Sequence, residues 1–127
     1  MDSGWFILGP EVDAFEDEWA KYCDAKHAVG LANGLDALIL ALRALDVGPG
    51  DEVIVPSNTY IATWLAVSAV GATPVPVEPD SNTYNIDTTL IAAAITPKTK
   101  VILPVHLYGQ PADMDPILTL ARQHDIW

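Results

Sequence analysis

Apolar and polar residues form two different patterns along the chain. In residues 10–23, "PEVDAFEDEWAKYC", apolar side chains recur at helical spacing, which predicts a helix with a packed apolar face and a solvated acidic face. Further along, short continuous runs of Val, Ile and Leu predict buried strands, and each is followed by a segment with a helical pattern. The expected strands are residues 27–32, 52–57, 73–79 and 100–109, and the helices that follow them are residues 34–45, 59–70, 87–95 and 113–125.

This alternation of strand and helix determines the expected fold. Continuous apolar strands between helices are typical of a parallel sheet covered on both faces, so we expect a three-layer α/β/α architecture with a mainly parallel sheet. Pro74 and Pro76 favour an edge position for their strand, and Asp87 is the expected N-cap of the next helix. The final residues, "IW", indicate the first step of another strand, so we expect residues 1–127 to be part of a larger domain.

The charge balance narrows the choice of partners. The chain has 127 residues with 17 carboxylates against 6 lysines and arginines, a net charge of -11. Nucleic acid and anionic membranes are therefore poor partners, because both attract clustered basic residues. No run approaches the roughly 20 apolar residues of a membrane span, and the N-terminus lacks the basic region of a secretion signal. With Cys23 as its one cysteine the chain fits a reducing compartment, and we expect a cytoplasmic protein.

Ligands of parallel α/β sheets bind beyond the carboxyl ends of the strands, so the residues after each expected strand form the candidate site. The first such segment is Asn33-Gly34-Leu35. A helix start offers unpaired N–H groups and the positive end of a dipole, which bind an anion without a basic residue, and Gly34 lets a ligand approach the backbone. The alternative is an ordinary N-cap by Asn33 at a tight turn.

Two further segments carry aromatic or titratable side chains. We expect Tyr60 just inside a helix start with its ring over a flat ligand; the alternative is a cap by Asn58 or Thr59, with Tyr60 as a packing residue. His106 and Tyr108 end the last expected strand and are candidates for substrate contact, although a lone histidine there is more often structural. We expect no metal site, since no second His or Cys is suitably spaced.

Three segments together resemble one enzyme family: "GPEVDAFEDEWAKYCDAKHAVGLANGLDALILALRAL", "GPGDEVIVPSNTYIATWLAVSAVGATPVPVEPD" and "HLYGQPADMDPI". They are similar to the front part of the nucleotide-sugar aminotransferases, which are pyridoxal-phosphate enzymes of the aspartate-aminotransferase fold, fold type I. "PSNTYIATWLAVS" and "HLYGQPADMD" most resemble the branch that acts on the C3 ketone of dTDP-6-deoxyhexoses. The resemblance implies pyridoxal 5'-phosphate as cofactor, a dTDP-keto-deoxysugar and an amino donor such as glutamate as substrates, and a homodimer.

The resemblance also implies roles for the candidate residues. The turn Asn33-Gly34-Leu35 is expected to give backbone N–H groups to the cofactor phosphate, and Tyr60 is expected to stack on the pyridine ring. One position departs from the family pattern. Many members have Ser or Thr where this chain has Leu35, and that hydroxyl also contacts the phosphate.

The residues that carry the family's chemistry are not found in this sequence. In the family, the aspartate that pairs with the pyridine nitrogen and the lysine that binds the cofactor covalently follow the segment that matches Trp127. The lysines of this chain lie at the wrong ends of their elements: Lys21, Lys26, Lys98 and Lys100. We therefore expect no catalytic residue here and no activity from these residues alone. Two alternatives stay open, a related sugar dehydratase and a non-catalytic binding or assembly module.

Overall fold

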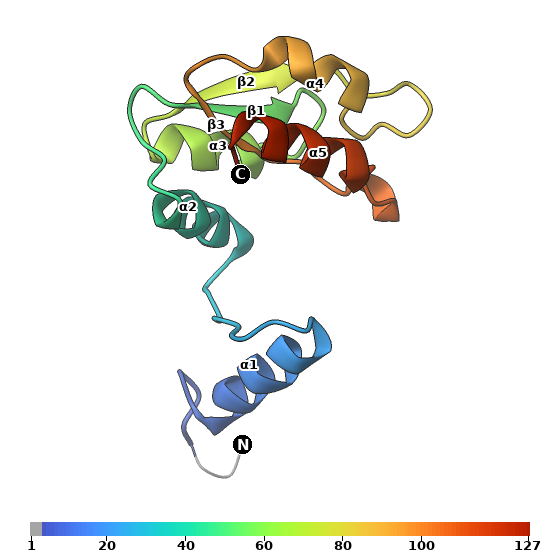
Figure 1. Cartoon of the computed structure of the whole chain (residues 1–127). Helices are drawn as coiled ribbons and strands as arrows, with labels where there is room; N and C mark the ends of the chain where they lie inside the picture. Colours follow the sequence, from blue (N-terminus) through green and yellow to red (C-terminus); the bar gives the residue numbers. More distant parts are fainter. Residues whose placement is uncertain (1–3) are drawn as a thin grey trace. The chain divides into compact units, whose positions relative to one another are not determined.

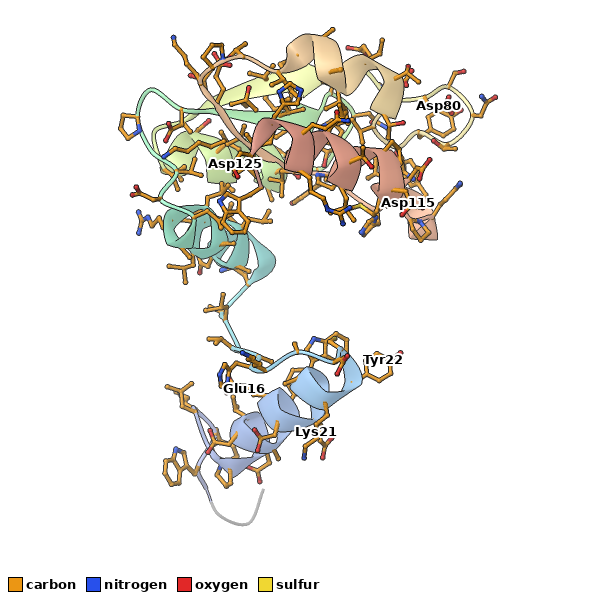
Figure 2. All side chains as sticks on the ribbon, viewed as in Figure 1. Glu16, Lys21, Tyr22, Asp80, Asp115 and Asp125 are labelled. Atoms are coloured by element: carbon orange, nitrogen blue, oxygen red, sulfur yellow. The ribbon has the colours of Figure 1, made fainter. Side chains whose placement is uncertain are left out.

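The structure, a computed structural model, describes residues 4–127 and consists of two compact units, one ending at Ala32 and one spanning Asn33–Trp127. Among its described residues, the first unit contains the helix α1 (Pro10–Tyr22), which confirms the sequence prediction. Pro10 takes the first helical position, where the missing N–H leaves no hydrogen bond unmade. The carboxylate of Glu16, labelled in Figure 2, accepts a hydrogen bond from the N–H of Gly30 and so ties the following chain to the helix.

The aromatic face of α1 is not packed as the sequence predicted. Phe15, Trp19 and Tyr22 form a stacked row, with ring centroids 5.9 and 5.6 Å apart, and all three side chains are at least half exposed. The first unit offers no second helix or strand among residues 4–32 for this face to pack against. The row is therefore a sizeable apolar surface open to solvent in this chain.

Residues 27–32 do not form the predicted strand. They have no regular secondary structure, and the pairing of the described strands includes none of them. A strand persists only when a neighbour accepts and donates its ladder hydrogen bonds, so an apolar run without a partner stays irregular.

The second unit contains a parallel sheet of three strands, β1 (Glu52–Pro56), β2 (Thr73–Val77) and β3 (Thr99–Ile102), in the order β2-β1-β3 (Figure 1). The edge position predicted for β2 is confirmed. Its two prolines lie two positions apart, so both nitrogens that lack a hydrogen face the same side of the strand. The prediction that β3 runs to residue 109 is wrong, because Pro104 has no N–H for the ladder and the chain leaves the sheet there.

Helices cover both faces of this sheet, which confirms the three-layer α/β/α fold (Figure 1). Val53 and Val55 of β1 point to one face, where they pack with α2 (Gly34–Ala44) and α3 (Ala62–Ala69). Ile54 points to the other face, where it packs with α4 (Thr88–Ala94) and α5 (Met114–His124). Asp87 caps α4 as predicted, with its side chain accepting from the N–H of Thr89.

The last residue of the chain pairs with β3 in a parallel sense. Trp127 donates its N–H to the carbonyl of Lys100 at 2.9 Å, and its own carbonyl accepts from the N–H of Ile102 at 2.8 Å. These two bonds bracket Val101 in the pattern that a parallel neighbouring strand makes. The expectation of a strand at "IW" is thereby supported, on the side of β3 away from β1.

Candidate functional site

An apolar cleft of about 620 Å³ lies at the carboxyl ends of β1 and β3. Its walls are the start of α2, the segment between β1 and α3, and Val105 from the chain that follows β3. The cleft therefore brings Asn33, Gly34 and Leu35 together with Tyr60, as the sequence predicted for one ligand site at this edge of the sheet.

Asn33 is the N-cap of α2. Its Oδ1 accepts the N–H of Asp36 at 2.9 Å, and its Nδ2 donates to the carboxylate of Asp36 at the same distance. Its backbone carbonyl accepts the N–H of Ala37. The capping alternative is thus confirmed for the Asn33 side chain, which holds the helix start in one conformation.

This cap leaves two donors unused. Among the described residues, the N–H groups of Gly34 and Leu35 have no hydrogen-bond acceptor, because the cap and the first helical bond serve Asp36 and Ala37. A Cβ at Gly34 would meet no atom within 4 Å, so the space beside this backbone is open. Two free N–H groups at the positive end of a helix dipole are suited to bind an anion, and the Asn33 cap leaves them available.

Tyr60 lies before α3 and not just inside it. The helix begins at Ala62, its N-cap Ile61 makes no side-chain cap bond, and Tyr60 accepts the N–H of Thr63 through its carbonyl. The alternative of a cap by Asn58 or Thr59 is therefore wrong: the hydroxyl of Thr59 bonds the hydroxyl of Thr63 at 2.9 Å instead.

The Tyr60 side chain is also not a packing residue. It is 76% exposed while it lines the cleft, so its ring is not part of the core. An exposed aromatic ring on an apolar cleft wall is suited to contact a flat ligand.

His106 and Tyr108 are not among the residues that line this cleft, although the chain enters their loop directly from Val105. They do not end β3, because the strand stops at Ile102. Nδ1 of His106 accepts the N–H of Ala112 at 2.9 Å, which gives that nitrogen a structural role. Tyr108 belongs to a short 3-10 turn (Leu107–Gly109) and is 79% exposed.

Asn85 is a residue that the sequence reasoning missed. It is only 3% exposed, and its side chain bonds three backbone groups of the segment that follows His106. No local pattern marks such a residue, since these partners lie 22 to 26 positions away along the chain.

A second, polar hollow of about 380 Å³ lies between the loop after β2 and the start of α5. Asp80, labelled in Figure 2, lies in that loop, and hydrogen bonds from the N–H groups of Asn82 and Thr83 lower the pKa of its carboxyl. Within residues 4–127, no group of three potential ligands is arranged for a metal ion.

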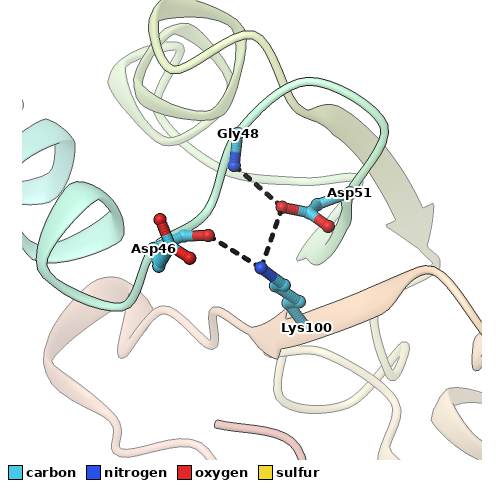
Figure 3. Close-up of polar contacts among 4 residues, drawn as sticks. All are labelled: Asp46, Gly48, Asp51 and Lys100. Atoms are coloured by element: carbon cyan, nitrogen blue, oxygen red, sulfur yellow. Dashed lines mark hydrogen bonds and ion pairs between the residues drawn. The ribbon is translucent and has the colours of Figure 1, made fainter.

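The amino ends of the strands carry a closed polar network (Figure 3). The ammonium of Lys100 lies 3.3 Å from the carboxylate of Asp51 and donates to the carbonyl of Asp46 at 2.8 Å. The same carboxylate oxygen of Asp51 accepts the N–H of Gly48 at 2.9 Å. The pKa of Asp51 is lowered chiefly by this backbone bond and then by Lys100. Lys100 is thus engaged at the end of the sheet opposite the cleft.

Comparison with known proteins identifies the family of this chain. The DegT/DnrJ/EryC1/StrS aminotransferase family matches residues 1–127. The chain is 61% identical over 126 residues to the dTDP-3-amino-3,4,6-trideoxy-alpha-D-glucose transaminase of Streptomyces venezuelae. It is also 61% identical to the dTDP-3-amino-3,6-dideoxy-alpha-D-galactopyranose transaminase of Aneurinibacillus thermoaerophilus. Both alignments cover 99% of this chain but only 33% and 35% of the relatives, so the chain spans about a third of their length.

Solved structures extend the similarity to the fold. The DesV protein of S. venezuelae superimposes with a TM-score of 0.94 at 62% identity, covering 98% of this chain and 34% of that chain. A Bacillus subtilis protein with its bound cofactor pmp superimposes with a TM-score of 0.95 at 41% identity, covering 98% and 29%. Pyridoxal 5'-phosphate is the cofactor of this family. From sequence and fold together, this chain belongs to the DegT/DnrJ/EryC1/StrS aminotransferase family.

Proposed function

We propose that this chain forms the cofactor-phosphate and ring-stacking wall of an enzyme that transfers an amino group to the C3 ketone of a dTDP-keto-6-deoxysugar. One observation carries the proposal. The free N–H groups of Gly34 and Leu35 and the exposed ring of Tyr60 line the same cleft at the carboxyl ends of the strands. Two relatives, both dTDP-3-amino-sugar transaminases, support the choice of sugar.

The groups that line the cleft support its assignment to pyridoxal 5'-phosphate. A phosphate ester carries nearly two negative charges at neutral pH, and the start of α2 offers it two N–H donors at the positive end of the helix dipole. Gly34 has no side chain, and the space beside it is open, so a phosphate oxygen has access to the backbone. Leu38 and Leu65 add apolar lining that suits an aromatic ring.

In the proposed reaction, the residues of this chain bind the cofactor and the sugar and orient them. When bound, pyridoxal phosphate supplies the electron sink that allows an amino group to pass from a donor, such as glutamate, to a ketone. Gly34 and Leu35 hold the phosphate, and Tyr60 holds the ring by stacking. His106 and Tyr108, on the loop that continues from the cleft wall, are proposed to contact the sugar. None of the lysines described here is proposed to bind the cofactor covalently, so residues 1–127 alone are expected to be inactive.

We also propose that the enzyme works as a homodimer in the cytoplasm. The exposed row of Phe15, Trp19 and Tyr22 supports self-association, since large apolar patches on soluble proteins commonly mark interfaces. The one cysteine, Cys23, is unpaired and exposed, which is compatible with a reducing compartment. No helix of the described residues is both long and apolar enough to cross a membrane. Light scattering on the full-length gene product measures the oligomeric state directly.

Amino transfer by the full-length gene product tests the proposed activity. The protein is supplied with pyridoxal phosphate, glutamate and a dTDP-3-keto-6-deoxyhexose, and the products are identified by mass spectrometry. We expect a sugar nucleotide in which an amino group replaces the C3 ketone oxygen, together with 2-oxoglutarate. A product that has lost water and gained no nitrogen would favour the dehydratase alternative. No conversion by a protein that binds both ligands would favour the binding module.

A further inference from the structure

Asn85 joins two loops that are far apart in the sequence. It lies between β2 and α4, and its side chain is buried. Its Nδ2 donates to the carbonyls of Gln110 and Pro111 at 3.0 and 3.2 Å, and its Oδ1 accepts the N–H of Leu107 at 2.9 Å. One amide thus fixes both ends of the turn that carries Tyr108.

The turn held by Asn85 has a conformation that needs such support. Tyr108 is a non-glycine residue in the left-handed region, with φ of 55°, and the next residue, Gly109, has φ of 79°. Tyr84, also left-handed with φ of 61°, sets its ring edge-on to the Tyr108 ring at a centroid distance of 6.2 Å. Left-handed non-glycine residues persist where the surrounding structure holds them and are concentrated at binding sites.

The same turn presents polar groups next to the cleft. Nδ1 of His106 accepts a hydrogen bond from Ala112, so a neutral imidazole carries its proton on Nε2. The exposed side chains of His106 and Tyr108 therefore offer a ring N–H, a hydroxyl and an aromatic face, the groups that recognise sugar hydroxyls. The loop begins at Val105, which lines the cofactor cleft.

We propose that Asn85 is a positioning residue for the sugar-nucleotide substrate. It fixes the His106–Gly109 loop in the geometry that meets the sugar, and it does so through backbone groups without touching the substrate. This inference rests on the proposed function, since it places the amino-acceptor sugar beside that loop. If Asn85 had a purely structural role, its replacement would lower stability and leave the affinity for the sugar unchanged.

The test compares Asn85→Ala with Asn82→Ala in the full-length gene product. Asn82 is exposed in the same loop and serves as the matched control. The probe is the aminated dTDP-6-deoxyhexose that the proposed reaction yields, titrated by calorimetry into the cofactor-loaded protein. Cofactor affinity is measured by absorbance, and hydrogen exchange reports on the amides of residues 106–109.

For Asn85→Ala we expect about a tenfold loss of affinity for the probe, because a displaced loop loses its aligned contacts. Exchange at residues 106–109 rises, and cofactor affinity stays within about twofold, since none of residues 106–109 lines the cofactor cleft. Asn82→Ala leaves all three readouts at the wild-type level. Unchanged probe affinity with a loosened loop would overturn the proposal, and so would an equal loss of probe and cofactor affinity.

A second variant keeps the test valid if Asn85→Ala does not fold. Tyr84 is more than half exposed, and asparagine tolerates its left-handed backbone, so Tyr84→Asn removes the ring contact with Tyr108 without disturbing the core. We expect a smaller loss of probe affinity, and unchanged affinity would overturn the proposal. Failure of the proposed function has a separate signature: the wild-type protein itself would bind no cofactor or no probe, and this inference would fall with it.

Discussion

The two ends of the parallel sheet use polar groups in opposite ways. At the amino ends, Lys100 and Asp51 satisfy each other and nearby backbone groups, so the network is closed (Figure 3). At the carboxyl ends, Gly34 and Leu35 keep N–H groups without an acceptor in the described chain, and Tyr60 exposes its ring. Closed networks stabilise the fold, whereas open donors beside an apolar cleft remain available to a ligand.

The comparison also shows that the basic side chain and the proposed anion site lie at opposite ends of the sheet. The lysine of the network lies at the end without the cleft, while the proposed phosphate site contains no basic side chain. In a chain with a net charge of -11, an anion has to be bound by local backbone groups. Changes at the carboxyl end should therefore alter ligand affinity, and changes at the amino end should alter stability alone.

The largest expected effect is that of Gly34→Val on cofactor affinity. The Cβ and its methyl groups would occupy the open space beside the two free N–H groups and block the phosphate. Loss of two charge-assisted hydrogen bonds, at about 1.5 kcal/mol each, predicts roughly a hundredfold weaker binding. Absorbance titration of the full-length gene product measures it. Because no atom lies within 4 Å of the new Cβ, the variant should melt close to the wild type, and wild-type affinity would remove the phosphate from this helix start.

The next effect is that of Tyr60→Ala, with Tyr60→Phe as its matched control. Stacking depends on the ring and not on the hydroxyl, and aromatic pairs contribute about 0.5–1.5 kcal/mol beyond area burial. Tyr60→Ala should therefore lose about tenfold in cofactor affinity, and Tyr60→Phe should keep most of it. The same absorbance titration reports both variants. Since Tyr60 is 76% exposed, the melting temperature without cofactor should barely change; a large drop there with unchanged affinity would mean that the ring serves the fold.

A smaller, opposite effect is expected from Leu35→Ser. The hydroxyl adds one donor beside the phosphate, which at about 1 kcal/mol predicts roughly fivefold tighter cofactor binding. Leu35 also packs partly against the core formed by α2 and α3, so the variant should melt at a lower temperature. Cofactor titration and a melting curve separate the two changes. Weaker binding would indicate that the Leu35 side chain itself contacts the cofactor.

The smallest effect is expected at the amino end, from Asp51→Asn. The amide oxygen still accepts from Gly48, but the charge that faces Lys100 is gone. The folded-state pKa of Asp51 is lowered, so its charge stabilises the fold above the ordinary carboxyl pKa, and this contribution is lost as the pH falls through the lowered value. The variant should thus melt slightly below the wild type at neutral pH, and the gap should close in acid. Cofactor affinity should not change. A loss of affinity would contradict the claim that the amino ends of the strands serve stability alone.

Much of the fold follows from the sequence because its signals are local. The continuous apolar strands, the prolines of β2 and the Asp87 cap predicted the layers, the edge strand and a helix start correctly. The prediction of a strand at residues 27–32 was wrong for a non-local reason. A strand needs a partner strand, and the pattern of one segment does not reveal whether that partner is present. The end of β3 was misplaced because the apolar run continues past Pro104, where the ladder stops.

In the candidate site, too, the features set by local sequence could be predicted and those set by distant residues could not. Its helix start was predictable, because Asn33 and Gly34 carry their own capping and turn chemistry. The start of α3 was predicted three positions too early, at residue 59 and not at Ala62, since the hydroxyls of Thr59 and Thr63 bond each other and α3 starts without a side-chain cap. Asn85 was not predictable at all, because its role depends on long-range backbone partners.

One measurement tests the division between the two ends most directly. In the full-length gene product labelled with ¹⁵N-glycine, the amides of Gly34 and Gly48 are followed by NMR while pyridoxal phosphate is added. Gly34 has a free N–H at the proposed phosphate site, and Gly48 donates to Asp51 at the opposite end of the sheet. We predict a large shift of the Gly34 signal, saturating with cofactor binding, and an unmoved Gly48 signal. A stationary Gly34 signal at saturating cofactor would contradict the account, because the phosphate would then be bound elsewhere.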